Sequence, residues 1–332
     1  MKRFAVLLLS LFLLSACGQI APEPETEAPT EIITTAEAET TIEATFAPIS
    51  GQRNMVKWRT LDVNSDEGRE ATQWLANQWK KTMRGSQSDQ SMGKDKKIVT
   101  EDGNLVLREN AAGKKTVLLE KTYLGEATTP EEASLHEEAW KYPSIIQALD
   151  DRYFVYCWSY WEGSGQPGVY DTKNLRAIPI EYDAEYMDGD WVAKSQMIFA
   201  DALYLSEGSY DPHCGPLRLM RVDLNALPAL QDGEGLPAVN VLEDIPGVED
   251  VQDMNSRFVT RDERWFLLND MAGVRVYDLR HKKLALRLPA SVFGPGVERM
   301  DCSSVLVPRD NRVYWTDYNG AVGSYLAEIT LP

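Results

Sequence analysis

The chain has 332 residues, and its 51 Asp and Glu residues outnumber its 34 Lys and Arg residues, which gives a formal net charge of −17. This sign repels phosphate backbones, so we expect no nucleic-acid partner. Hydrophobic residues make up 43% of the chain, which is enough for a substantial buried core.

An apolar segment near the N-terminus has the pattern of an export signal. Two basic residues precede the apolar run 4–14, which is too short to span a bilayer and ends in Leu14-Ser15-Ala16-Cys17. This motif resembles the lipobox of bacterial lipoproteins, whose cysteine is lipidated and becomes the mature N-terminus. The resemblance implies a signal peptide over 1–16, acyl chains on Cys17 and a lipid anchor at the extracytoplasmic face of the cell membrane. The alternative is an ordinary secretory signal with a chance cysteine.

Residues 17–50 differ in composition from the rest of the chain. Over 18–50 there are seven Glu, seven Thr, six Ala and four Pro, with no Lys, Arg, Tyr or Trp. Such a segment buries too little apolar surface to offset the entropy of ordering, so we expect a disordered acidic tether. Its Thr and Pro content also fits a glycosylated stalk. Either form would hold the folded part away from the membrane.

The segment 51–95 is expected to hold a strand, a helix and a loop. Val56–Leu61 reads as a β-strand, and Glu70–Met83 reads as a helix. The helix carries a broad apolar stripe made of Ala71, Trp74, Leu75, Trp79 and Met83. We expect this stripe to dock on the rest of the domain, and a partner-binding helix is the alternative. Gly85–Lys97, rich in Ser, Gln, Lys and Gly, is expected to be a mobile loop.

The region 96–332 repeats one pattern five times, an acidic or polar turn followed directly by a strong strand. The turns are Glu101-Asp102-Gly103, Asp150-Asp151, Ala200-Asp201, Asp262-Glu263 and Asp310-Asn311. The strands are 104–109, 152–161, 202–207, 264–270 and 312–317. Such regular spacing predicts a repeat architecture. Because 153–161 and 265–268 are apolar on both faces, we expect their sheets to be covered on both sides.

Each repeat can be read as four short strands, and together they resemble the β-propeller superfamily of the WD40-like or YVTN-like kind. The resemblance implies an all-β fold of about five four-stranded blades, in which a Val/Tyr-Asp pair closes the third strand. The last unit offers only three strands before Pro332, so we expect Val56–Leu61 to donate the fourth and close that blade. No consistent Trp-Asp or Gly-His signature assigns a subfamily.

Tyr170-Asp171 and Tyr277-Asp278 are the clearest copies of the pair that closes the third strand. We expect their carboxylates to accept backbone N–H bonds and to fix the turn that follows. Ligand binding by these aspartates is the alternative, and their recurrence in similar turns favours the structural role.

Few patterns of known chemistry occur in the sequence. The motifs GxSxG, GxGxxG, CxxC and the P-loop are absent, and His136, His213 and His281 stand far apart. We therefore predict no catalytic residues, no cofactor and no zinc site.

Two smaller groups of side chains leave alternatives open. The acids of the segment 183–190 have a spacing loosely like a calcium loop, and a solvated acidic loop is the reading that we favour; they are Asp183, Glu185, Asp188 and Asp190. Apart from Cys17 the cysteines are Cys157, Cys214 and Cys302. They form either one disulfide and a free thiol or three buried thiols, and we favour the thiols.

A candidate ligand face follows from the propeller, because the loop after the second strand lies at the same end of every blade. Carboxylates and aromatic side chains are expected there, namely Glu109, Trp158, Trp161, Glu162, Glu207, Asp270, Trp315 and Asp317. Aromatic rings stack on sugars and carboxylates bond their hydroxyls, so the face suits a glycan, and it also suits a cationic peptide. The alternative is that the carboxylates are ordinary turn residues and that the aromatic rings fill the core between blades.

These observations favour a lipid-anchored extracytoplasmic binding or scaffold protein that presents a propeller surface to a protein, peptide or glycan of the cell envelope. Short loops on a rigid repeat make broad surfaces, and no catalytic motif is visible. The rival is a glycan-active, glycosidase-like enzyme that uses carboxylates on the propeller face.

Overall fold

The computed structural model describes most of the chain beyond residue 49. The described residues are 50–84, 89–110, 112–123, 140–160, 163–181, 191–192, 197–207, 217–249, 251, 256–270, 272–294, 296–299, 304–318 and 322–332. All of them belong to one compact unit, Pro48–Pro332. No helix among these residues is long and apolar enough to cross a membrane.

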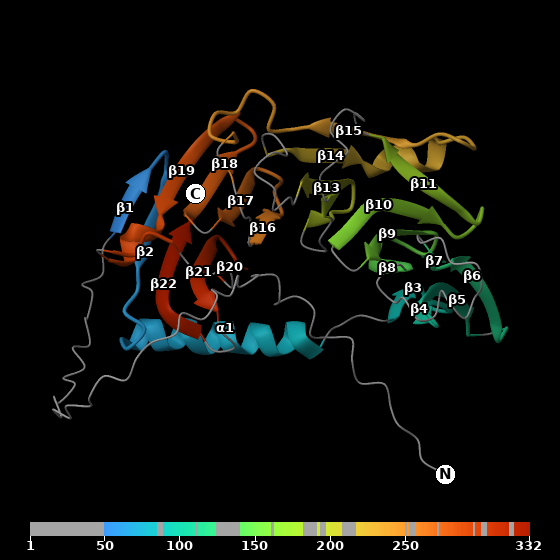
Figure 1. Cartoon of the computed structure of the whole chain (residues 1–332), viewed down its shortest axis with the longest axis horizontal. Coiled ribbons are helices and arrows are strands. Elements are labelled where there is room, and N and C mark those ends of the chain that lie inside the picture. Colours follow the sequence, from blue (N-terminus) through green and yellow to red (C-terminus); the bar gives the residue numbers. More distant parts are fainter. Residues whose placement is uncertain are drawn as a thin grey trace, which may run out of the picture. The chain divides into compact units, whose positions relative to one another are not determined.

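The described strands form five antiparallel blades that follow one another along the chain (Figure 1). Blade 1 is β3 (Asp89–Met92), β4 (Lys96–Glu101), β5 (Asn104–Glu109) and β6 (Lys114–Leu119). Blade 2 is β8 (Trp140–Ala148), β9 (Tyr153–Tyr160), β10 (Gly163–Asp171) and β11 (Arg176–Glu181), with the short β7 (Thr122–Tyr123) beside β8. Blade 3 is β12 (Trp191–Val192), β13 (Ala202–Glu207), β14 (Leu219–Asp223) and β15 (Leu236–Asn240). Blade 4 is β16 (Ser256–Val259), β17 (Trp265–Asp270), β18 (Gly273–Asp278) and β19 (Lys283–Pro289).

Blade 5 combines the two ends of the domain. Its C-terminal strands are β20 (Val305–Arg309), β21 (Arg312–Tyr318) and β22 (Val322–Thr330), and β2 (Val56–Thr60) pairs with β22 as the fourth strand. The pairing is antiparallel and runs from Lys57 opposite Thr330 to Thr60 opposite Ala327. A further strand, β1 (Ser50–Arg53), lies outside β2. The predicted closing strand is therefore confirmed, and the strand order is that of a β-propeller.

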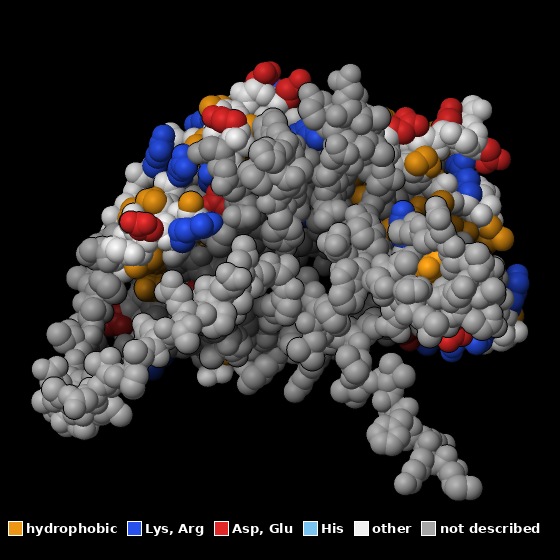
Figure 2. All heavy atoms as spheres, viewed as in Figure 1, with side chains coloured by type: hydrophobic (Ala, Val, Ile, Leu, Met, Phe, Trp, Pro, Cys, Tyr) orange, Lys and Arg blue, Asp and Glu red, His pale blue; other side chains and the backbone are white. Residues whose placement is uncertain are grey.

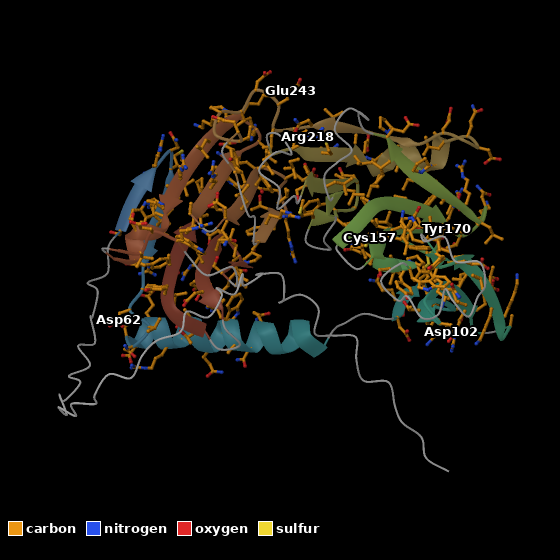
Figure 3. The ribbon with its side chains drawn as sticks, in the orientation of Figure 1. Asp62, Asp102, Cys157, Tyr170, Arg218 and Glu243 are labelled. Atoms are coloured by element: carbon orange, nitrogen blue, oxygen red, sulfur yellow. The ribbon has the colours of Figure 1, made fainter. Side chains whose placement is uncertain are left out.

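Hydrophobic cores lie between consecutive blades, from blade 1 to blade 5. All six residues of β17 are buried, which confirms the prediction for 265–268. In β9 residues 153–156 are buried and 157–159 are half-buried. Tyr170, labelled in Figure 3, lies in the core shared by blades 1 and 2. Its ring stacks on Phe154 with 5.3 Å between ring centroids.

The helix α1 (Asp66–Arg84) packs on blade 5, where Figure 1 shows it beside β22. It begins after Ser65, whose hydroxyl accepts a hydrogen bond from the N–H of Gly68 at 3.0 Å, a typical N-cap. Ala71 and Leu75 are buried on β21 and β22, and Trp74 packs beside them. The described part of the predicted stripe thus docks on the domain. The side chains of Trp79 and Met83 lie outside the described residues.

The aspartates of the Tyr-Asp pairs fix turns, as the sequence predicts. Asp171 is fully buried, and its carboxylate accepts hydrogen bonds from the N–H groups of Lys173 and Asn174 at 3.0 and 3.2 Å. Asp278 accepts one from the N–H of His281 at 3.1 Å. The recurrence of this bonding in blades 2 and 4 supports the structural role of both carboxylates.

In each of these turns an arginine, which we did not predict from the sequence, also binds the aspartate. Arg152 donates two hydrogen bonds to Asp171, at 2.9 and 2.6 Å, and Arg264 donates one to Asp278 at 3.2 Å. Each guanidinium also lies over the aromatic ring that follows it, 4.6 Å from the centroid of Tyr153 and 4.4 Å from that of Trp265. Burial would raise the pKa of Asp171, but the bonds from Arg152 and the turn outweigh it and lower that pKa.

Blades 2 and 3 are joined through their outer strands. β11 pairs with β15 in parallel, with Ile180 opposite Leu236, so the two blades form one continuous sheet. The carboxylate of Glu181 accepts the N–H of Gly235 at 3.1 Å. Arg176 donates to the carbonyl oxygen of Leu230 at 2.9 Å, which holds the segment that leads into β15.

Candidate functional site

Each blade has two ends, which we name from blade 2. The turn end holds Asp150-Asp151, between the first and second strands, and the loop end is where the second strand β9 ends at Tyr160.

Hydrogen bonds join the turn ends of consecutive blades. The Tyr204 hydroxyl of blade 3 donates to Glu263 of blade 4 at 2.6 Å, and Asn54 of blade 5 donates to the carbonyl oxygen of Ala285 of blade 4 at 3.0 Å.

Blade 1 is offset by one strand from the predicted alignment. The expected loop over Gly85–Lys97 contains β3, so Asp102-Gly103 joins the second and third strands of this blade. A Cβ placed on Gly103 would lie 2.9 Å from the Tyr142 ring, near the start of β8 at the loop end of blade 2. A Cβ on Gly93, in the turn after β3, would lie 3.3 Å from Asp151.

Glu109 therefore lies at the turn end, because it ends the third strand of blade 1. Glu207, Asp270 and Asp317 lie on the second strands of their blades, at or near the loop end. The structure thus keeps these three residues at equivalent ends of their blades and separates Glu109 from them. The physical reason is that adjacent strands run in opposite directions, so a shift of one strand exchanges the two ends.

Asp270 and Trp315 are buried within the fold. Asp270 is 3% exposed, and it accepts hydrogen bonds from the N–H groups of Ala272 and Gly273, both at 2.9 Å. Its second oxygen pairs with the buried Arg275 at 3.2 Å. Trp315 is 0% exposed and packs on Phe293, with 4.8 Å between ring centroids. Asp270 is thus a turn residue and Trp315 fills the core between blades, which is the alternative to a ligand face that we gave in the sequence analysis.

The remaining predicted residues divide into surface positions and undescribed ones. Asp317 is half-buried and accepts the N–H of Tyr325 at 3.0 Å. Trp158 is half-buried near the end of β9, with the ammonium of Lys141 5.0 Å from its ring centroid. Cys157 has a free thiol whose pKa is raised by burial. The predictions for Cys17, Trp161, Glu162, Asp183, Glu185, Asp188, Asp190, Cys214 and Cys302 lie outside the described residues.

A row of aromatic side chains lies at the loop end of blade 2. We call Tyr123, Trp140 and Tyr142, together with Lys121, the Tyr–Trp row. Tyr123 pairs with Trp140 across β7 and β8, and their rings meet edge to face at 5.2 Å. The Lys121 ammonium lies 4.7 Å from the centroid of Trp140, and the side chains of Lys121 and Tyr142 both lie beside Gly103.

The Tyr–Trp row is accessible from solvent. Lys121 is exposed and the three rings are half-buried. A hydrogen bond to blade 1 fixes the backbone of the row at Lys121, whose N–H donates to the side chain of Asn104 at 2.8 Å. Half-buried rings on a fixed backbone can stack on the CH-rich face of a sugar, and an ammonium can bond its hydroxyl or acidic groups.

Sequence reasoning missed the Tyr–Trp row because its members come from two short segments. Thr122-Tyr123 and Trp140-Lys141-Tyr142 are separated by sixteen residues, 124–139, that the repeat pattern does not cover. The signal that could have identified the row was the presence of aromatic residues directly before and directly after that segment.

One acid near the Tyr–Trp row is paired with two cations. Glu101, in the strand before Asp102-Gly103, binds Arg108 and Lys115, and their hydrogen bonds lower the pKa of Glu101 to about 2. Figure 2 shows acidic and basic side chains interspersed over the described part of the face that it views. Among the described residues, no group of three His, Cys, Asp or Glu side chains could hold a metal ion.

Comparisons with known proteins found likeness in structure only. No protein-family model and no curated protein sequence matches the chain. The β-propeller domain of Cps50 (Swd1) from Myceliophteria thermophila is 10% identical, with a TM-score of 0.43 over 72% of this chain and 68% of that one. A chain of the mitotic checkpoint complex is 10% identical, with a TM-score of 0.37 over 68% and 56%. For Porphyromonas gingivalis dipeptidyl peptidase 4 the identity is 10% and the TM-score 0.36, over 70% of this chain and 36% of that one.

Proposed function

We propose that this chain is a lipid-anchored, extracytoplasmic binding protein whose propeller presents the Tyr–Trp row to a glycan of the cell envelope. The lipid anchor is supported by the motif Leu14-Ser15-Ala16-Cys17 after an apolar run. The binding role is supported by one observation above all, the half-buried rings of Tyr123, Trp140 and Tyr142 at one end of blade 2.

Glycans fit this surface better than peptides. The rings offer flat apolar faces in reach of solvent, and the one charged member of the row is a lysine rather than a carboxylate. A cationic peptide would need acids beside the rings. Glu101, near the row, is already paired with Arg108 and Lys115, which leaves Asp102 and Glu120 as the exposed acids there. The broad propeller surface and the fixed backbone of Lys121 favour reversible binding in a preformed site.

The test is a glycan array followed by calorimetric titration of the best ligand with the mature chain, residues 17–332. Trp140→Ala should weaken binding about 10- to 100-fold, the range for loss of an anchoring aromatic side chain. Trp58→Ala, which removes another half-buried tryptophan on the distant β2, should leave affinity unchanged. Binding of peptides but not of glycans, or equal affinity for the two variants, would contradict the proposal.

A further inference from the structure

A patch of basic side chains lies at the turn ends of blades 4 and 5. The turn between β18 and β19 contributes Arg280, Lys282 and Lys283, and the hairpin of β1 and β2 contributes Arg53 and Lys57. All five side chains are exposed. The two hairpins are joined directly, because the Asn54 side chain donates a hydrogen bond to the carbonyl oxygen of Ala285 at 3.0 Å. We call these five residues the basic patch.

Charge is concentrated here although the chain as a whole carries −17. Within the part of the chain that the structure describes, none of the five cations forms an ion pair. The buried acids beside them are occupied by other partners. Asp278 binds Arg264 and His281, and Glu328 binds Arg59 and Arg312.

Exposed acids of the same blades lie at the same turn end, but at the opposite edge of each sheet. Asp262 and Asp310 belong to the turns between the first and second strands, whereas the basic patch surrounds the third and fourth strands and β1. Asp262 is also engaged locally, since it accepts a hydrogen bond from the Thr260 hydroxyl at 2.6 Å. Glu243 and Asp244 are also exposed, in the segment whose Gly247 lies beside Leu284 of β19. The five cations therefore form an exposed group that is bordered by acids.

An apolar side chain stands at the tip of the hairpin that carries Arg53 and Lys57. Met55 is 64% exposed, and it has a φ of 71°, a left-handed conformation that favours Gly at this position of a tight hairpin. Neither burial nor backbone preference explains a methionine there. An apolar tip flanked by cations is the composition of a surface that enters the headgroup region of an anionic bilayer.

We propose that the basic patch and Met55 dock on an anionic membrane surface, as a second contact beside the lipid on Cys17. This inference rests on the proposed lipid anchor. The place of the predicted tether, residues 17–50, supports it, because the tether ends at Ser50 and the four-residue strand β1 leads from there to Arg53 and the hairpin tip. In this orientation the turn ends of blades 4 and 5 face the bilayer. The loop end, with the Tyr–Trp row, faces away from the membrane and stays accessible to ligands.

The experiment uses the mature chain, residues 17–332, with Cys17→Ala so that no lipid contributes. It measures cosedimentation with phosphatidylcholine vesicles that do or do not contain phosphatidylglycerol. We expect binding only to the anionic vesicles, and a loss on adding salt. The double variant Lys282→Gln, Lys283→Gln should lower the partition coefficient about 25-fold, roughly fivefold for each cation. Met55→Ser should also lower it, without lowering the melting temperature.

A matched control removes two exposed, unpaired lysines of blade 1. Lys94→Gln with Lys114→Gln makes the same change of net charge and should leave partitioning unchanged. Equal partitioning of the two double variants, or equal binding to neutral vesicles, overturns the inference. So does binding that appears only after residues 17–47 are deleted, because the acidic tether would then be the occupant of the patch. A chain that binds anionic vesicles but no glycan contradicts the glycan site alone.

Discussion

Removal of β2 should unfold most of the molecules, because this strand closes blade 5. Its four residue pairs with β22 and the bond from the Leu61 N–H to the Leu326 carbonyl oxygen amount to about five backbone hydrogen bonds, each contributing about 1 kcal/mol. Full burial of Val56 adds roughly 2 kcal/mol. The lost stabilisation of about 7 kcal/mol is comparable to the whole free energy of unfolding of a typical domain, roughly 5–15 kcal/mol.

The assay compares two truncated chains by urea unfolding, followed by tryptophan fluorescence. A chain beginning at Asn54 lacks β1 only and should lose less than about 2 kcal/mol, because the side chains of β1 are exposed or half-buried. A chain beginning at Asp62 lacks β2 and Leu61 as well and should be largely unfolded without urea. A peptide of residues 50–61 added in excess should restore folding by mass action. If both chains unfold at the same urea concentration, β2 does not close the domain.

Three further changes have expected outcomes. Cys17→Ala should release the protein from membranes after a high-salt wash, and retention after that wash would show another anchor than lipid and charge. Asp171→Asn should lower the free energy of unfolding by about 1–3 kcal/mol at pH 7. Because folding lowers the pKa of Asp171, the contribution of its charge is complete above the unfolded pKa of about 4 and is lost as the pH falls through the folded pKa. The difference between the urea midpoints of variant and parent should therefore shrink as the pH falls below about 4, and a constant difference would exclude the charge as the cause. Gly68→Ala should destabilise the domain by more than about 1 kcal/mol, because the added Cβ would lie 1.9 Å from the Asp62 carbonyl oxygen. An unhindered Gly→Ala change in a helix stabilises by about 1 kcal/mol instead. A raised melting temperature of the variant would therefore contradict the prediction.

Local patterns in the sequence were sufficient to predict most of the fold. The turns before the strong strands, the closing strand at Val56 and the apolar stripe of α1 each depend on residues that are near one another in the chain. Blade 1 was placed wrongly by one strand, because Gly93 and Gly103 both stand in short polar turns. The approach of Gly93 to Asp151 and of Gly103 to Tyr142, both in the next blade, decides which turn lies at which end.

The candidate site was less predictable than the fold, because it depends on contacts between distant segments. The pairing of Tyr123 with Trp140 crosses a segment without any repeat pattern, and nothing local indicates it. Burial also cannot be read from residue type. Asp270 and Trp315 have the chemistry of a glycan site, yet Arg275 and Phe293 occupy them inside the fold.

The parallel pairing of β11 with β15 has a consequence for how the protein opens. Blades that touch only through side chains can separate one at a time, whereas β11 and β15 are paired along their backbones, with Ile180 opposite Leu236 and Glu181 opposite Pro237. Blades 2 and 3 should therefore open as a single cooperative unit in native-state hydrogen exchange. Amide protons of β11 and β15 should exchange with one common free energy, while those of β19 follow a separate one.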